Sequence, residues 1–135
     1  MKLLDTTVVI DIDRGGSEVL SKVRKLDRTG THAISVVTQY EFYWGIFRRY
    51  QKGSKKYEEA MDKAEMMFSR FYLLPVTPEI AIKAAEIGTY LISQGKEVDL
   101  MDTYIASTAI LHRLTLVTAN IAHFEEIDKL KVKQW

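Results

Sequence analysis

The chain has 135 residues, of which 47% are hydrophobic and 27% are charged. A chain of this length and composition is typical of one folded domain and is not intrinsically disordered. Nineteen basic and eighteen acidic residues give a net charge of +1, which does not by itself indicate a nucleic-acid-binding protein, and the absence of cysteine excludes disulfide bonds and thiolate metal sites.

The N-terminal segment carries no targeting or membrane signal. Its apolar run, "LLDTTVVI" at residues 3–10, is interrupted at once by Asp5. A signal peptide needs an unbroken apolar stretch, and a membrane-spanning helix needs about 20 apolar residues. We therefore expect a cytoplasmic protein that does not cross a membrane.

Short apolar segments alternate with amphipathic ones along the chain. In chain order we predict a strand at 2–5, a helix at 6–12, a helix at 17–28, a strand at 32–37, a helix at about 38–51, a helix at 55–71, a strand at 72–77, a helix at 78–95, a helix at 100–113, a strand at 114–118 and a fifth strand at 130–135. Strands of this kind, alternating with helices, favour an α/β fold with a parallel sheet covered on both faces.

Helix boundaries are predicted from capping residues. Ser17 is expected to cap one helix, and Pro78 and Gly95 are expected to begin and end another. Thr38 and Glu41 have the spacing of a capping box, in which the hydroxyl and the carboxylate satisfy free backbone N–H groups. Glu41 therefore has two interpretations, a helix cap and a functional carboxylate.

Acidic and amide side chains follow the predicted strands. Asp5 ends the first strand, Glu41 lies one turn into the helix after the second, and Asn120 follows the fourth. Asp99 and Asp102 begin the helix that precedes the fourth strand. The carboxyl ends of parallel strands share one edge of the sheet, where α/β proteins bind ligands. We therefore expect these side chains to meet there, including Asp102 if its helix starts at that edge.

Several carboxylates in one cleft repel one another unless a cation neutralises them. Oxygen ligands without histidine or cysteine suit Mg²⁺ or Mn²⁺ better than zinc. A carboxylate-bound Mg²⁺ binds phosphate oxygens and activates water, so the pattern indicates phosphodiester hydrolysis. The segment 48–56 holds five basic residues and no acid, and it is available to bind a polyanion.

Helix capping is the alternative for each of these residues taken singly. Asp5 could cap the helix that follows it, and Asp99 could cap the helix whose positive end Asp102 favours. Asn120 could be a turn residue. Capping does not require one such residue from each connection to converge, however, and convergence is what the predicted topology produces.

Four segments, "LLDTTVVID", "SVVTQYEFYWGI", "DTYIASTAI" and "LTLVTANIAHF", occur in the order and spacing of PIN-domain proteins. The chain resembles this family over residues 1–135, as a single PIN domain, and is most similar to VapC-type toxins of toxin–antitoxin pairs. The resemblance implies a three-layer α/β/α fold with a central parallel sheet of four to five strands and a metal-dependent endoribonuclease activity. It also implies a homodimer and a small VapB-like antitoxin that occludes the active site.

The resemblance implies roles for particular residues. It assigns Asp5, Glu41 and Asp102 as catalytic acids that hold Mg²⁺, with Mn²⁺ as a substitute. Asn120 stands where many PIN domains have an aspartate, so one charge is missing and a second metal ion is left open. Asp99 is a candidate for a compensating carboxylate.

Other residues are expected to support the acids or to contact RNA. Hydroxyl groups beside the acids are expected to hydrogen-bond to them and fix their rotamers. The hydroxyl residues are Thr6, Thr7 and Thr118, and the candidates for RNA binding are Arg48, Arg49, Lys52, Lys55, Lys56 and His123. Two other functions stay open: a cleavage-inactive PIN domain that binds RNA or a partner protein, which Asn120 allows, and a housekeeping RNA-processing nuclease without an antitoxin.

Overall fold

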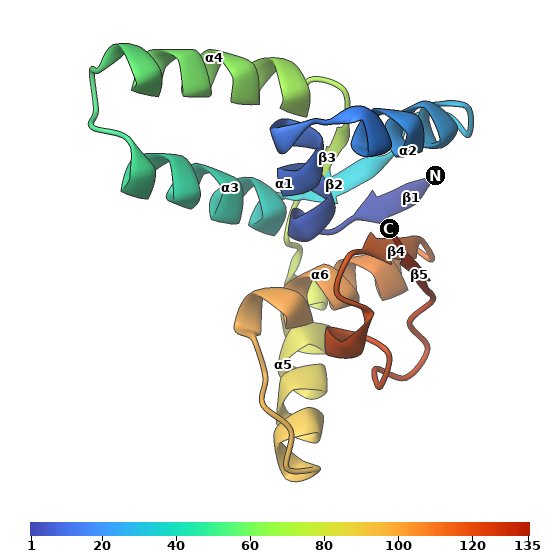
Figure 1. Cartoon of the computed structure of the whole chain (residues 1–135). Helices are drawn as coiled ribbons and strands as arrows, with labels where there is room; N and C mark the ends of the chain where they lie inside the picture. Colours follow the sequence, from blue (N-terminus) through green and yellow to red (C-terminus); the bar gives the residue numbers. More distant parts are fainter.

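The structure, a computed structural model, describes all residues from 1 to 135. Every predicted strand and helix is present, as Figure 1 shows. The elements are β1 (Lys2–Leu4), α1 (Thr6–Arg14), α2 (Ser17–Asp27), β2 (Ala33–Ser35), α3 (Val36–Arg49), α4 (Lys55–Phe68), β3 (Tyr72–Leu74), α5 (Pro78–Ser93), α6 (Leu100–Leu111), β4 (Thr115–Thr118), the short 3₁₀ helix η1 (Ile121–His123) and β5 (Val132–Gln134).

The five strands form one parallel sheet in the order β3-β2-β1-β4-β5. β1 is central, with Leu3 paired to Ala33 on one side and to Leu116 on the other. From β1 the chain continues to β2 and β3 on one side of the sheet, and β4 and β5 lie on the other side of β1. The strand order therefore reverses at β1. Ligand sites in parallel sheets lie beyond the carboxyl ends of strands at such a reversal, and Asp5 stands at this position.

Helices cover both faces of the sheet (Figure 1). Consecutive strand residues point to opposite faces, so Leu3 packs in a buried cluster with α5 and α6, whereas Leu4 packs in a second cluster with α1, α2, α3 and α4. The predicted three-layer α/β/α fold is confirmed. We call the layer of α1 to α4 the upper layer and that of α5 and α6 the lower layer.

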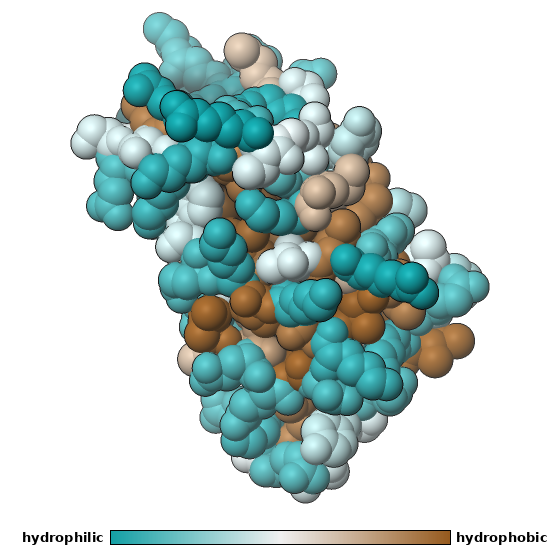
Figure 2. All heavy atoms as spheres, turned by 90° about the vertical axis from the view of Figure 1, so that its right-hand side faces the viewer, coloured by the Kyte–Doolittle hydropathy of each residue, from teal (hydrophilic) through white to brown (hydrophobic).

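The side toward which both chain termini lie is mostly hydrophilic. Figure 2 shows hydrophobic residues on this side mainly in its middle and lower parts. None of the helices has the length and hydrophobicity that crossing a membrane requires.

The start of α3 differs from the prediction. β2 is paired with β3 up to Ser35, and α3 begins at Val36, two residues before Thr38. The Ser35 hydroxyl accepts the backbone N–H of Val37 at 3.1 Å. Thr38 is fully buried, and its hydroxyl lies 3.2 Å from the Thr6 hydroxyl rather than capping the backbone of α3. The capping box predicted for Thr38 and Glu41 is therefore wrong.

Replacing Ser35 with alanine should lower the free energy of unfolding by about 1 kcal/mol, because the Val37 N–H at the start of α3 loses its acceptor. Urea denaturation measures the loss, and amide hydrogen exchange locates it. Exchange at Val37 should accelerate in the variant. An unchanged rate at this amide would contradict the assignment of Ser35 as the cap.

Three further helix boundaries test the capping predictions. Gly16, with φ 111°, occupies the N-cap position of α2, and Ser17 lies inside the helix, so the predicted Ser17 cap is wrong. The backbone at Gly16 is in a region that favours glycine, and no side-chain cap is made. Pro78 begins α5 as predicted, after the Thr77 cap, and Gly95 follows its end with φ 75°.

Candidate active site

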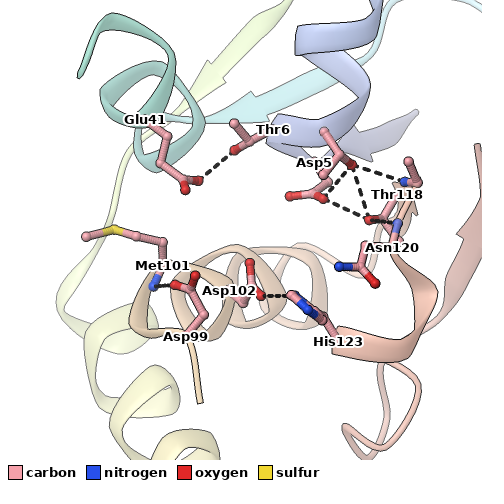
Figure 3. Close-up of polar contacts among 11 residues, drawn as sticks. Asp5, Thr6, Glu41, Asp99, Met101, Asp102, Thr118, Asn120 and His123 are labelled. Atoms are coloured by element: carbon pink, nitrogen blue, oxygen red, sulfur yellow. Dashed lines mark hydrogen bonds and ion pairs between the residues drawn. The ribbon is translucent and has the colours of Figure 1, made fainter. Parts of the chain in front are cut away.

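Asp5 follows β1 directly and is 3% exposed. Its backbone N–H donates to the Val117 carbonyl at 2.9 Å, which ties this residue to β4. It occupies the N-cap position of α1, but its side chain makes no capping hydrogen bond. Instead, Oδ2 accepts from the hydroxyl groups of Thr7 and Thr118, both at 2.8 Å (Figure 3). The carboxylate is thus fixed from both α1 and β4.

Glu41 lies in the second turn of α3 and is half-buried. Its Oε1 accepts a hydrogen bond from Thr6 Oγ1 at 2.7 Å. Thr6 is the first residue of α1 and directly follows Asp5, so the two neighbouring threonines 6 and 7 hold different acids. This bond turns Glu41 toward the start of α1 (Figure 3).

Asp99 and Asp102 lie at the start of α6. Asp99 is the N-cap, with Oδ1 accepting the Met101 N–H at 2.8 Å, so the capping interpretation of this residue is observed. Asp102 is in the first turn, and its side chain is 19% exposed. The His123 ring donates from Nδ1 to Asp102 Oδ2 at 2.9 Å. His123 therefore contacts a candidate catalytic acid directly.

Asn120 follows β4 at the start of η1. Its backbone N–H donates to Thr118 Oγ1 at 3.0 Å, so one hydroxyl joins the Asn120 backbone to the Asp5 carboxylate. Figure 3 shows the Asn120 amide turned toward the space between Asp5 and Asp102. The side chains that face this space come from four separate segments of the chain. Asp102 joins the others because α6 starts beside them, which is the condition stated for it in the sequence analysis.

Two of the acids, Asp102 and Glu41, have raised pKa values. Burial raises the pKa of Asp102 from its ordinary value of 3.8 to about 6; the charge of Asp99 adds to this effect, and the hydrogen bond from His123 opposes it. Burial also raises the pKa of Glu41, against the hydrogen bond from Thr6, and the charges of Asp102 and Asp5 add smaller repulsions. The space between the acids therefore carries surplus negative charge that a cation would neutralise.

Comparison with known proteins decides the family. Residues 2–130 match the family model described as the PIN domain. The chain belongs to the PIN-domain family. Over 131 residues it is 33% identical to Ribonuclease VapC1 of Methanocaldococcus jannaschii, covering 97% of this chain and 84% of that protein. Within the family, this PIN domain therefore groups with the VapC ribonucleases.

Solved structures support the same grouping. VapBC2 from Rickettsia felis, solved with a DNA fragment from its promoter, matches with a TM-score of 0.86 and 27% identity over 99% of this chain and 98% of that chain. A toxin–antitoxin complex from Klebsiella pneumoniae matches with a TM-score of 0.70 and 26% identity over 96% of this chain and 95% of that chain.

The basic residues proposed for RNA binding are placed very differently in this PIN domain. The Arg48 guanidinium lies 4.9 Å from the centre of the Trp44 ring. Lys52 is exposed in the turn between α3 and α4, and Lys55 pairs weakly with Glu59 at 3.9 Å. By contrast, Arg49 and Lys56 line a groove that Glu41 also lines.

The sequence analysis named only Glu41, Arg49 and Lys56 among the residues that line this groove. Arg14, at the end of α1, and Gly45, in the middle of α3, also line it. A glycine inside a helical pattern is a signal that could have identified Gly45, because glycine is unfavourable there unless it has a specific use. Arg14 had no such signal, since its position depends on how α1 packs beside α3.

Proposed function

We propose that this PIN domain is a metal-dependent endoribonuclease and acts as the toxin of a toxin–antitoxin pair. The observation that carries the proposal is the convergence of Asp5, Glu41 and Asp102 at the carboxyl edge of the sheet (Figure 3). The ribonuclease name of its relative supports RNA as the substrate.

Hydrogen bonds fix the side-chain orientations of Asp5 and Glu41. Thr7 and Thr118 together hold Oδ2 of Asp5, and Thr6 holds Oε1 of Glu41. In each carboxylate the second oxygen has no protein donor and is available to a ligand. Fixed side chains lose little rotamer freedom when they bind, so the donors are preorganised.

We propose Mg²⁺ as the cation, with Mn²⁺ as a substitute. The donors are carboxylate and amide oxygens, which these ions prefer. Burial is the main cause of the raised pKa values of Glu41 and Asp102, and the charges of neighbouring acids add to it, so a cation bound there would favour the ionised carboxylates. No three acidic or histidine side chains lie close enough as they stand to enclose an ion, so an ion would be held partly through bound water, as Mg²⁺ commonly is. When bound, the ion would supply a Lewis acid for activating water toward an RNA phosphate.

Glu41→Gln is the sharpest single test of the proposal. The glutamine carbonyl can still accept the Thr6 hydrogen bond, and the repulsion from neighbouring acids is removed, so the fold should lose no stability. RNA cleavage should fall by about 10²-fold or more, since one anionic ligand is lost. Cleavage of a labelled single-stranded RNA, with and without EDTA, measures the effect.

The outcome that would overturn the proposal is equally specific. Full cleavage by the Glu41→Gln protein, or cleavage by the unaltered protein that persists in EDTA, is incompatible with a carboxylate-held metal. The thermal unfolding curves of both proteins serve as the control, because they separate a lost ligand from a damaged fold.

We also propose a VapB-like antitoxin partner, a homodimer and a cytoplasmic location. The support for the partner is the likeness to a solved structure of VapBC2 and to one described as a toxin–antitoxin complex. The antitoxin is expected to cover the carboxylates described above, since these are the groups that act on RNA.

A second candidate function is RNA binding without cleavage. Asn120 favours it, because a neutral amide faces the acids and contributes no charge to hold a cation. Purified protein that binds RNA but leaves it intact in the presence of Mn²⁺ would establish this function in place of the first.

A further inference from the structure

A groove of about 470 Å³ runs between α1, α3 and α4. It is lined by Glu41 near the start of α3 and by Arg49 at the end of α3, so it follows this helix away from the carboxylates. Figure 1 shows that the far ends of α3 and α4 extend beyond the sheet. The groove therefore leads from the candidate active site out along this helical pair.

One face of α3 forms a wall of the groove. Glu41, Gly45 and Arg49 are spaced four residues apart, so they lie on the same side of the helix, and all three line the groove. The order along this face is an acid of the candidate active site, a position without a side chain, and a cation.

Gly45 has no structural explanation within the chain. Glycine inside a helix is less stable than alanine, and the backbone at Gly45 is ordinary helix without a positive φ. A Cβ atom at this position would meet no other atom within 4 Å. No packing contact therefore requires glycine, and its effect on the molecule is to leave the wall of the groove open.

Some of the charged side chains that line the groove form ion pairs, and others do not. Lys63 is bound to Asp13 at 3.1 Å, and Glu59 is near Lys55 at 3.9 Å. The remaining cations, Arg14, Arg49 and Lys56, are exposed and take part in no ion pair. Three unpaired cations along one groove suit a ligand with repeated negative charges, and phosphates of a nucleic acid have that pattern.

We propose that this groove binds the RNA strand on one side of the scissile phosphate, with backbone phosphates held by Arg14, Arg49 and Lys56 and the strand passing closely over Gly45. The inference rests on the proposed ribonuclease function and adds the path of the substrate. The proposal assigns RNA binding to Arg49 and not to its neighbour Arg48. The Arg48 guanidinium is held over the Trp44 ring, and Arg48 does not line the groove.

Arg49→Gln and Arg48→Gln form a matched pair for testing this path. Both remove one positive charge from adjacent positions of the same helix. RNA binding is measured in the Asp5→Asn background, which keeps the RNA intact, by fluorescence anisotropy of a labelled unstructured 12-nucleotide RNA. Arg49→Gln should weaken binding about tenfold and reduce the slope of log K against log salt by about 0.7, the value for one phosphate contact with a single strand. Arg48→Gln should change affinity less than twofold.

Gly45→Ala and Gly45→Gln test the close approach to α3. Both should raise the melting temperature, by about 3 °C for alanine, because both residues are better helix formers than glycine. Both should weaken RNA binding, and glutamine should do so more than alanine. Gly88→Ala, in α5 and away from the groove, is the matched control and should leave RNA affinity unchanged.

The outcomes separate this inference from the proposed function. Equal RNA affinity in the Arg49 and Arg48 variants, or unchanged affinity in both Gly45 variants, overturns the RNA path. If RNA affinity is unchanged while the same variants lose binding to an antitoxin, the groove is a peptide-binding surface and the inference is wrong. Failure of the unaltered protein to cleave RNA overturns the proposed function instead, because binding in the Asp5→Asn background is measured without cleavage.

Discussion

Replacing Asp102 with asparagine should raise the melting temperature of the metal-free protein at pH 8 and, in the same protein, reduce RNA cleavage by about 10³-fold. The loss of cleavage is expected because a proposed metal ligand loses its charge. The gain in stability follows from the pKa of Asp102, which burial and then the charge of Asp99 raise from 3.8 to about 6.

The direction of the stability effect depends on pH. A raised pKa means that the folded protein favours the protonated carboxyl group, so this contribution to stability is present in full below about pH 3.8 and is lost as the pH rises through about 6. Asparagine is neutral at every pH and can still accept the hydrogen bond from His123. The variant should therefore be more stable than the unaltered protein at pH 8, and the difference should disappear near pH 4.

Thermal unfolding in EDTA at pH 4 and pH 8 measures the change in stability, and an RNA cleavage assay at pH 8 measures the loss of activity. Asp62→Asn is the control, because Asp62 is exposed on α4 and forms no ion pair. It should change neither stability nor cleavage. A destabilised Asp102→Asn protein at pH 8 would show that burial and repulsion at this position are weaker than inferred.

Mg²⁺ or Mn²⁺ should stabilise the protein strongly at pH 8 and much less at pH 5. At a hundredfold excess over its dissociation constant a ligand adds about 2.7 kcal/mol, equivalent to a rise of about 10 °C in melting temperature for a domain of this size. At pH 5, Asp102 is largely protonated, and Glu41 also has a raised pKa. Protonation competes with the cation for the same oxygens.

Differential scanning fluorimetry in the two buffers, with titration calorimetry at pH 8, measures this coupling. The Asp102→Asn protein should lose most of the shift at pH 8. An equal shift at both pH values would indicate a cation bound elsewhere on the surface, and the absence of any shift would contradict the proposed cofactor.

The alternation of strands and helices, and the meeting of the acids, could be predicted because both depend on local pattern and topology. Each strand is a short apolar run, and a parallel sheet brings the residues after its strands to one edge. Asp5 and Asn120 therefore could be placed near each other although 115 positions separate them.

The start of α3 could not be predicted, because two residues of the capping type, Ser35 and Thr38, lie three positions apart. Val36 and Val37 favour strands, which extended the predicted strand to residue 37. In the structure the pairing of β2 with β3 ends at Ser35, so a contact with a distant strand decides which residue caps the helix.

The role of the Asp5 side chain was likewise open between a cap and a functional group. Its partner Thr118 lies 113 residues away, and no local rule reveals that hydrogen bond. The groove was not predicted for a similar reason. Arg14 and Lys56 reach it from α1 and α4, and only the packing of these helices against α3 brings them together.

The acids of the candidate active site belong to different layers of the molecule. Asp5 and Glu41 are carried by the sheet and the upper layer, whereas Asp102 begins a helix of the lower layer. The spacing of the acids therefore follows the thickness of the core beneath α6, where Ala106 and Ala109 are fully buried. Redesign of this core for thermostability has to preserve its thickness. Larger side chains at these positions would move Asp102 away from Asp5 and Glu41 without contacting any of the three acids.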